Sequence, residues 1–205
     1  MTAAEIAARV RDVGFAVVAR PKVDVRSAYD RAVAQADASD VSVKQSTRVA
    51  DFVNRGSGFD PFWLDPILLA ICEHLFTQFK LSSFHARTVN PGAEAQELHV
   101  DIANEGELLG FIWMVDEFTD DNGATRLVPR GRSEPVTALG PPGTLLVYDG
   151  GILHGYGANR TREPRRSLQG AFVRRDISQG VDQRARLKPE TAARLDAHAK
   201  YLLDA

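Results

Sequence analysis

Two histidines and one aspartate are the residues of this sequence best suited to hold a metal ion. His99 and Asp101 form a His-x-Asp triplet in the run ELHVDI, and His154 follows later in GTLLVYDGGILHGYG. In a strand, the side chains of residues i and i+2 leave the same face, so the triplet presents an imidazole and a carboxylate together. A second histidine from a distant strand completes the two-histidine, one-carboxylate triad that holds non-haem Fe(II) and leaves coordination positions open.

Zinc is the rival metal for these ligands. Structural zinc sites are closed by four ligands and usually include cysteine, whereas this chain has a single cysteine, Cys72. The triplet alone is also consistent with an exposed polar strand face, and His154 alone with a buried structural histidine. The combination of the three ligands is what favours iron.

An arginine follows the second histidine closely enough to belong to the same site. Arg165 lies in TREPRRSLQGAF, and it shares one face of a predicted strand with Ser167. A hairpin would bring this face beside His154, where a guanidinium can bind a carboxylate in a bidentate manner. The adjacent Arg166 is the alternative, and a solvated basic loop is the other interpretation of this arginine cluster.

Candidate substrate-binding residues come from two places. Lys44, Arg48 and Arg55 lie in the polar segment 39–60, which we expect to be mobile, and their charge would attract an anionic substrate. Trp113 lies in the apolar run ELLGFIWMVDEF.

The alternation within that apolar run separates two pairs of side chains. Phe111 and Trp113 alternate with Ile112 and Met114, so one pair should face the interior of a barrel and the other should pack under helices. The sequence does not decide between the two arrangements.

The elements that must position these residues change in character near residue 80. Before it, apolar residues recur at helical spacing in three segments, and a short β-branched run at 14–19 predicts a strand: the helical segments are 3–13, 24–38 and 65–80. After it, short apolar runs are separated by Asn, Gly, Pro and Asp, which is typical of an antiparallel sandwich or barrel.

We expect one domain over residues 1–205. Its parts would be a mainly helical flank at 1–80, a β core at 81–176 and one closing helix at 187–203. The fold class is therefore mainly β with flanking α-helices.

Composition narrows the function classes. The 205 residues carry a formal net charge of −2, with 44% hydrophobic and 25% charged residues, so the chain has globular composition and no basic surplus for nucleic acid. No apolar run is long enough to span a membrane, and the first residues have no apolar signal core. We expect a soluble cytoplasmic protein with a small-molecule substrate, and the sequence leaves its oligomeric state open.

Four segments together resemble the phytanoyl-CoA dioxygenase family of Fe(II)/2-oxoglutarate oxygenases. They are VGFAVVARP (13–21), LHVD (98–101), WMVDEFTDDNGATRLVP (113–129) and GTLLVYDGGILHGYGANRTREPRRSL (143–168). The resemblance implies a double-stranded β-helix, also called a jelly roll or cupin-like barrel, with flanking helices.

The same resemblance implies roles for individual residues. His99, Asp101 and His154 would bind iron. Arg165, assisted by Ser167, would hold the distal carboxylate of 2-oxoglutarate. Thr88, on the strand before the triad, would be a further co-substrate contact.

The implied activity is oxidation of a small metabolite by dioxygen, with release of succinate and CO2. The carboxylate of Asp101 favours hydroxylation over halogenation, because halogenating relatives need a vacant position there. One departure from the family is that Pro129 is followed by Arg130-Gly131-Arg132 instead of Gly-Ser-His. The alternative functions are a cupin-like metal enzyme that does not use 2-oxoglutarate and a non-catalytic β-barrel that binds a small ligand.

Overall fold

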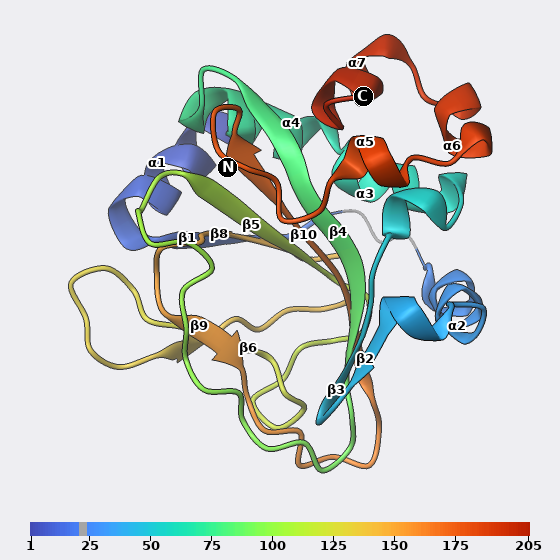
Figure 1. Cartoon of the computed structure of the whole chain (residues 1–205). Coiled ribbons are helices and arrows are strands. Elements are labelled where there is room, and N and C mark those ends of the chain that lie inside the picture. Colours follow the sequence, from blue (N-terminus) through green and yellow to red (C-terminus); the bar gives the residue numbers. More distant parts are fainter. Residues whose placement is uncertain (21–23) are drawn as a thin grey trace.

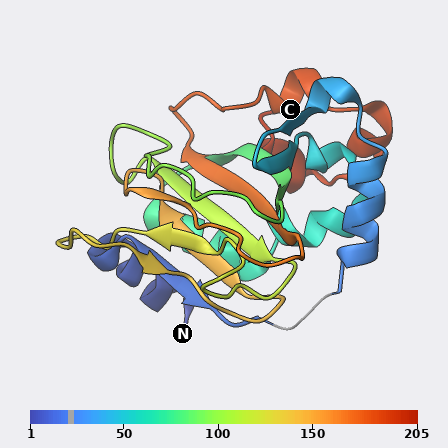
Figure 2. The ribbon, with the colours of Figure 1, turned by 90° about the horizontal axis from the view of Figure 1, so that it is seen from below.

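Two antiparallel β-sheets face each other, and helices cover the outer face of the larger one (Figures 1 and 2). The computed structural model describes residues 1–20 and 24–205. The large sheet has the strand order β1-β8-β5-β10-β4-β3-β2, and the small sheet has the order β7-β6-β9. This is the expected double-stranded β-helix.

The strands are short except for the two at the centre of the large sheet. Their bounds are β1 Phe15–Val18, β2 Val41–Val43, β3 Ser46–Val49, β4 Phe79–Val89, β5 Leu108–Met114, β6 Thr125–Leu127, β7 Val136–Thr137, β8 Leu145–Asp149, β9 His154–Tyr156 and β10 Arg165–Arg174.

The helices begin and end where local chemistry favours it. Their bounds are α1 Ala3–Val13, α2 Arg26–Ala34, α3 Asp60–Trp63, α4 Pro66–Leu75, α5 Gln183–Arg186, α6 Pro189–Arg194 and α7 Ala197–Leu202. Thr2 and Glu5 form a capping box at the start of α1, and Gly14 ends that helix with φ 97°. The side chain of Asp65 caps α4. Among the described residues, no helix is long and apolar enough to cross a membrane.

The strand β5 is buried on both faces, and its two faces serve different cores. Phe111 and Trp113 pack under the helices, whereas Ile112 and Met114 face the space between the sheets. The indole Nε1 of Trp113 donates a hydrogen bond to the backbone oxygen of Phe62 at 2.7 Å. The structure thus decides which pair faces inward.

The polar segment 39–60 is ordered by strand pairing, contrary to our expectation. Strands β2 and β3 form a hairpin, and β3 pairs with β4 at one edge of the large sheet. The guanidinium of Arg55 pairs with Asp40 at 2.7 Å, which fixes the chain on both sides of the hairpin. The segment 1–80 is therefore less helical than expected, since besides the expected strand β1 it supplies β2, β3 and the start of β4.

The tail differs from the expected single helix. The segment 187–203 contains α6 and α7, which are separated because Leu195 adopts an extended conformation and Asp196 then caps the next helix. Pro21, the last residue of the segment VGFAVVARP, lies outside the described residues.

Arg130, the residue at the departure from the family pattern, joins α1 to a loop and to the end of β8. Its guanidinium donates to the backbone oxygens of Val10 and Arg11 at the end of α1. It also forms ion pairs with Glu105, at 2.7 Å, and with Asp149. Since Asp149 is buried, Arg130 neutralises a carboxylate that has little access to water.

We predict that Arg130→Met destabilises the fold by about 1–3 kcal/mol, because it leaves the buried Asp149 carboxylate without its cation. The matched control is Arg132→Met, which removes the same charge from an exposed side chain two residues away. Urea denaturation measures both free energies of unfolding. Equal stability of the two variants would contradict the role given to Arg130.

Candidate metal centre

Two backbone hydrogen bonds bring the two histidines together. His99 donates from its N–H to the oxygen of His154 at 3.0 Å, and His154 donates back to the oxygen of His99 at 2.9 Å. His154 begins β9, which pairs with β6, whereas His99 is an isolated bridge residue outside any strand. The ELHVDI run is therefore irregular, contrary to expectation. The N–H of Asp101 is held by the oxygen of Gly150 at 2.8 Å.

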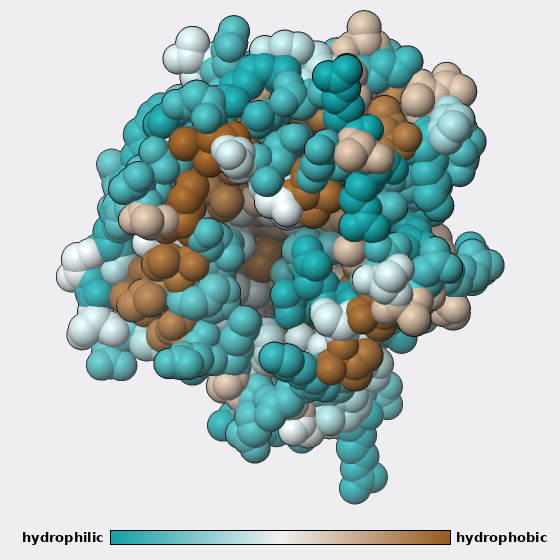
Figure 3. Space-filling view, viewed as in Figure 1, coloured by the Kyte–Doolittle hydropathy of each residue, from teal (hydrophilic) through white to brown (hydrophobic). Residues whose placement is uncertain are grey.

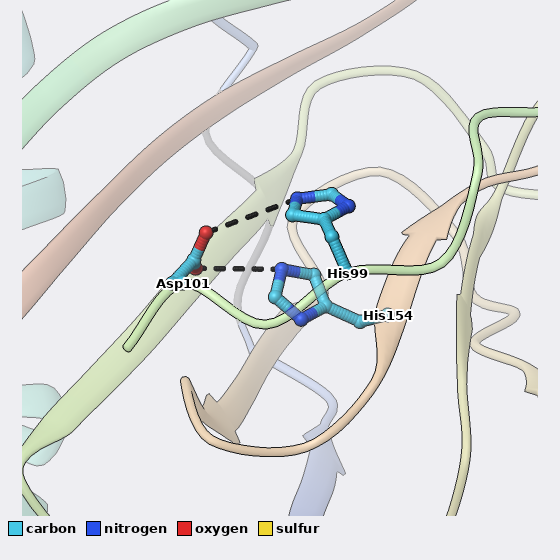
Figure 4. A group of neighbouring side chains, drawn as sticks. All are labelled: His99, Asp101 and His154. Carbon is cyan, nitrogen blue, oxygen red and sulfur yellow. Dashed lines mark ion pairs between the residues drawn. The ribbon is translucent and has the colours of Figure 1, made fainter. Parts of the chain in front are cut away.

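The side chains of the three residues converge on one point (Figure 4). The Nε2 atoms of His99 and His154 lie 3.9 Å and 3.3 Å from the two carboxylate oxygens of Asp101. One ligand atom from each residue lies within 4.8 Å of the others. Ligands at right angles and about 2.1 Å from a metal ion lie about 3 Å apart, so a small closing movement would fit a divalent ion.

The hydrogen bonds of the two imidazoles leave both Nε2 atoms free to bind a metal ion. The Nδ1 of His99 lies 3.1 Å from the oxygen of Glu97, and the Nδ1 of His154 lies 3.0 Å from the oxygen of Ile152. A carbonyl oxygen can only accept, so each Nδ1 carries the proton and each Nε2 presents a lone pair when the ring is neutral. Two imidazole lone pairs then face a carboxylate. A cation between the two imidazoles and the carboxylate would remove the repulsion between their lone pairs, so this set of donor atoms fits a metal ion.

Tyr148, on β8, orients the carboxylate. Its hydroxyl donates to Oδ2 of Asp101 at 3.1 Å, and its ring centroid lies 4.5 Å from that of His154. Burial raises the pKa of Tyr148 well above its ordinary value, and the charge of Asp101 raises it further, so the phenol keeps its proton. Burial also raises the pKa of Asp101, but the nearby imidazole of His154, when protonated, and the hydrogen bond from Tyr148 offset this, and the result lies below the ordinary value.

The tyrosine ring requires a glycine on the neighbouring strand. A Cβ atom at Gly110 of β5 would lie 2.2 Å from the ring of Tyr148, so no other residue fits without displacing it. The sequence does not single out Tyr148, since nothing in the pattern of β8 distinguishes it from a core aromatic residue.

A cavity of about 350 Å³ opens beside the triad. Figure 3 shows the corresponding face hollowed near its centre, with hydrophilic residues around the hollow. Besides the triad, the polar and charged residues that line it are Arg48, Ser82, Ser83, His85, Arg87, Gln96, Thr125, Tyr148, Tyr156, Gln169 and Ser178. Of these, only Arg48 was singled out from the sequence as facing a ligand, because the others become neighbours only through the pairing of distant strands.

Strand alternation separates the two candidate arginines. Arg166 points away from the space between the sheets, where it pairs with Asp30 at 2.7 Å and with Asp116 at 3.1 Å. Arg165 points inward and is fully buried. Its Nη1 donates to Oγ of Ser167 at 3.0 Å, and its guanidinium lies over the ring of Phe118. Arg165, and not Arg166, therefore has the geometry of an interior anchor.

Arg165 has an unsatisfied charge. No carboxylate of the described residues pairs with it, and its Nε has no hydrogen-bond partner. Burial lowers the pKa of Arg165 to about 9. Arg165 does not itself line the cavity, but it is linked to it: Gln169, a lining residue, donates to Oγ of Ser167 at 3.0 Å. The amide and the hydroxyl form a two-residue connection from the cavity to the guanidinium.

Four expected ligand contacts lie elsewhere, and those expectations are wrong. Thr88 is on the opposite face of β4, where its hydroxyl lies 2.9 Å from that of Tyr29. Trp113 belongs to the core under the helices. Lys44 is exposed at the tip of the β2–β3 hairpin, and Arg55 is engaged by Asp40. None of the four lines the cavity.

Comparison with known proteins gives one family and consistent relatives. The family described as phytanoyl-CoA dioxygenase (PhyH) matches residues 2–167. The dioxygenase cdmD of Talaromyces verruculosus is 30% identical over 128 residues, which cover 48% of this chain and 42% of the relative. The chain spans about half the length of the curated relatives it matches.

Two solved structures have the same fold. One is the non-heme alpha ketoglutarate dependent epimerase SnoN from nogalamycin biosynthesis, with a TM-score of 0.72 and 19% identity, covering 84% of this chain and 82% of SnoN. The other is HygX from Streptomyces hygroscopicus, with nickel and 2-oxoglutarate bound. Its TM-score is 0.72 at 13% identity, covering 85% of this chain and 88% of HygX.

We predict that Tyr148→Phe weakens binding of a divalent metal ion by about tenfold, since loss of a hydrogen bond to a metal ligand typically costs 10–100-fold. Titration with Co(II), followed by its visible absorption, measures the affinity. Tyr201→Phe, on the exposed side chain of α7, is the control and should bind as the unmodified protein does. Unchanged affinity in Tyr148→Phe would rule out the orienting role.

Proposed function

The chain belongs to the phytanoyl-CoA dioxygenase family, and we propose that it is an Fe(II)/2-oxoglutarate-dependent dioxygenase that oxidises a small molecule. The proposed reaction consumes dioxygen and releases succinate and CO2, with hydroxylation of a C–H bond as the expected outcome. One observation carries the proposal: ligand atoms of His99, Asp101 and His154 converge at the wall of a cavity.

The protein's part in this reaction is to hold and orient. Three protein ligands occupy half of an octahedral coordination sphere and leave the other half for small molecules. Bound iron, 2-oxoglutarate and dioxygen supply the oxidising chemistry. His99 and His154 present Nε2 because backbone oxygens hold their Nδ1 protons. Asp101 supplies one negative charge, and Tyr148 fixes the direction of its carboxylate.

We assign the distal carboxylate of 2-oxoglutarate to Arg165, with Ser167 beside it. The support is electrostatic: the guanidinium of Arg165 is fully buried, has no acidic partner in the described part of the chain, and its Nε has no hydrogen-bond partner. Burying a charge without a counter-ion is costly, and a bound carboxylate would offset that cost. A guanidinium also matches a carboxylate in geometry.

A second candidate is a cupin-like metal enzyme that does not use 2-oxoglutarate. The observation in its favour is that Arg165 lies outside the cavity lining, so the anchor must become accessible through the side chains next to it. The two candidates differ in whether 2-oxoglutarate binds at the metal centre. The third possibility, a binding protein without catalysis, is disfavoured by the complete set of metal ligands.

We predict that anaerobic addition of Fe(II) and 2-oxoglutarate produces a charge-transfer absorption band in the visible, because the co-substrate chelates the iron. The control is succinate in place of 2-oxoglutarate, which lacks the keto oxygen and should give no band. Absence of the band in protein shown to contain iron would exclude 2-oxoglutarate as the co-substrate.

We predict that Arg165→Ala weakens 2-oxoglutarate binding by at least about 30-fold, since truncating one member of a buried charge pair costs roughly 2–5 kcal/mol. Titration of the same absorption band measures the affinity. Iron binding should survive, which distinguishes loss of the anchor from loss of the fold. Arg166→Ala is the comparison variant, because its side chain faces the opposite side of β10. A larger loss in Arg166→Ala would overturn the assignment.

A further inference from the structure

Two arginines stand side by side on the cavity wall that is formed by the edge of the large sheet. Arg48 of β3 and Arg87 of β4 are direct partners in the antiparallel register, so their side chains leave the same face of the sheet. Both line the cavity that contains the metal ligands. Like charges at directly opposed positions destabilise a sheet. The presence of this arginine pair is therefore not explained by the stability of the sheet.

No acid in the described residues neutralises this pair. Arg48 makes no hydrogen bond or ion pair with any described residue and lies half-buried on the wall. Arg87 donates to two neutral groups, Oε1 of Gln169 at 3.2 Å and Oγ of Ser46 at 2.9 Å, and its Nη2 is left over. Burial lowers the pKa of Arg48, and the neighbouring charge of Arg87 lowers it further. The two cations are thus held together without a counter-ion.

The rest of this wall is polar and uncharged. His85 lies two residues before Arg87 on β4, and neither of its ring nitrogens has a hydrogen-bond partner. Burial, followed by the charges of Arg48 and Arg87, holds the pKa of His85 well below its ordinary value, so the ring is neutral. Ser82 and Ser83 line the same part of the cavity. These groups can donate hydrogen bonds to an anion without adding negative charge.

With a metal ion and 2-oxoglutarate bound, the site would keep an excess of positive charge that a further anion could neutralise. Asp101 is the only acid among the lining residues. Arg48, Arg87, Arg165 and a divalent metal ion carry five positive charges, against three negative charges on Asp101 and dianionic 2-oxoglutarate, which leaves an excess of two. The distal carboxylate of the co-substrate is assigned to Arg165 on β10. In the large sheet, β4 lies between β10 and β3, the strand that carries Arg48.

We propose that the substrate is a small organic anion whose carboxylate, phosphate or sulfate group is bound by Arg48 and Arg87. This proposal rests on the proposed function and adds the substrate class to it. Binding of the anion on β3 and β4 would turn the remainder of the molecule toward the triad, since both border one cavity. The expected residues Lys44 and Arg55 have no part in it.

The test uses the protein loaded with Zn(II), as an inert substitute for iron, and with 2-oxoglutarate. Acetate, inorganic phosphate and sulfate are each titrated at constant ionic strength, and calorimetry measures binding. We expect at least one of the three to bind, and the strongest identifies the anionic group. Arg48→Gln should weaken that binding at least tenfold while leaving the affinity for 2-oxoglutarate unchanged. Because the side chain of Arg48 makes no hydrogen bond or ion pair with the described residues, this variant should fold normally.

The matched control is Lys44→Gln, which removes one positive charge from the exposed tip of the same hairpin. It should bind the anions as the unmodified protein does. Failure of all three anions to bind would overturn the proposal, as would equal losses in Lys44→Gln and Arg48→Gln. A weaker affinity for 2-oxoglutarate in Arg48→Gln would also overturn it and assign this arginine to the co-substrate. Failure of the proposed function is a separate result, since it would appear as no charge-transfer band with Fe(II).

Discussion

The metal centre depends on one small piece of backbone pairing, the reciprocal hydrogen bonds between His99 and His154. These two bonds fix the separation of two residues that are distant along the chain, and the ring centroids consequently lie 4.7 Å apart. Backbone oxygens two residues earlier in the chain then select the tautomer of each ring. Asp101 reaches the same point because its N–H is tied to Gly150, which follows the buried Asp149 that Arg130 neutralises. The stability of α1 and the geometry of the site are thereby connected.

The two faces of the large sheet differ in composition and in role. The outer face is apolar and binds the helices, so it supplies most of the free energy of folding through burial. The inner face is apolar at the end formed by β1, β8 and β5, and a smaller apolar cluster of Leu108, Ala171 and Val173 extends to β10. Toward β10, β4 and β3 it carries Arg165, Arg87 and Arg48, and no described acid pairs with any of them. Such charges are unfavourable for stability alone, and the binding of anions accounts for them.

The sequence predicts the elements with strong local signals and fails where neighbours decide. Both ends of α1 and the start of α4 follow from Thr2, Gly14 and Asp65, which act within a few residues, whereas α4 ends at Leu75 although a helix was expected to residue 80. The metal triad can be recognised because its ligand types are rare and its order along the chain is informative. The face of Trp113 could not be predicted, since β5 is buried on both sides and alternation carries no information there. The two strands within the polar segment 39–60 could not be predicted, because the face of β3 that carries Arg48 lines a hydrophilic cavity. The role of Tyr148 depends on its hydrogen bond to Asp101, a residue distant along the chain.

We propose that His99, Asp101 and His154 share one ferrous ion. A crystal structure of the protein prepared with Fe(II) in the absence of oxygen, with diffraction data on both sides of the iron absorption edge, tests this most directly. We expect one anomalous peak within bonding distance of both Nε2 atoms and of a carboxylate oxygen of Asp101, with the remaining coordination positions of the iron open to the cavity. An iron peak elsewhere, or iron bound through Nδ1 of either histidine, would contradict it.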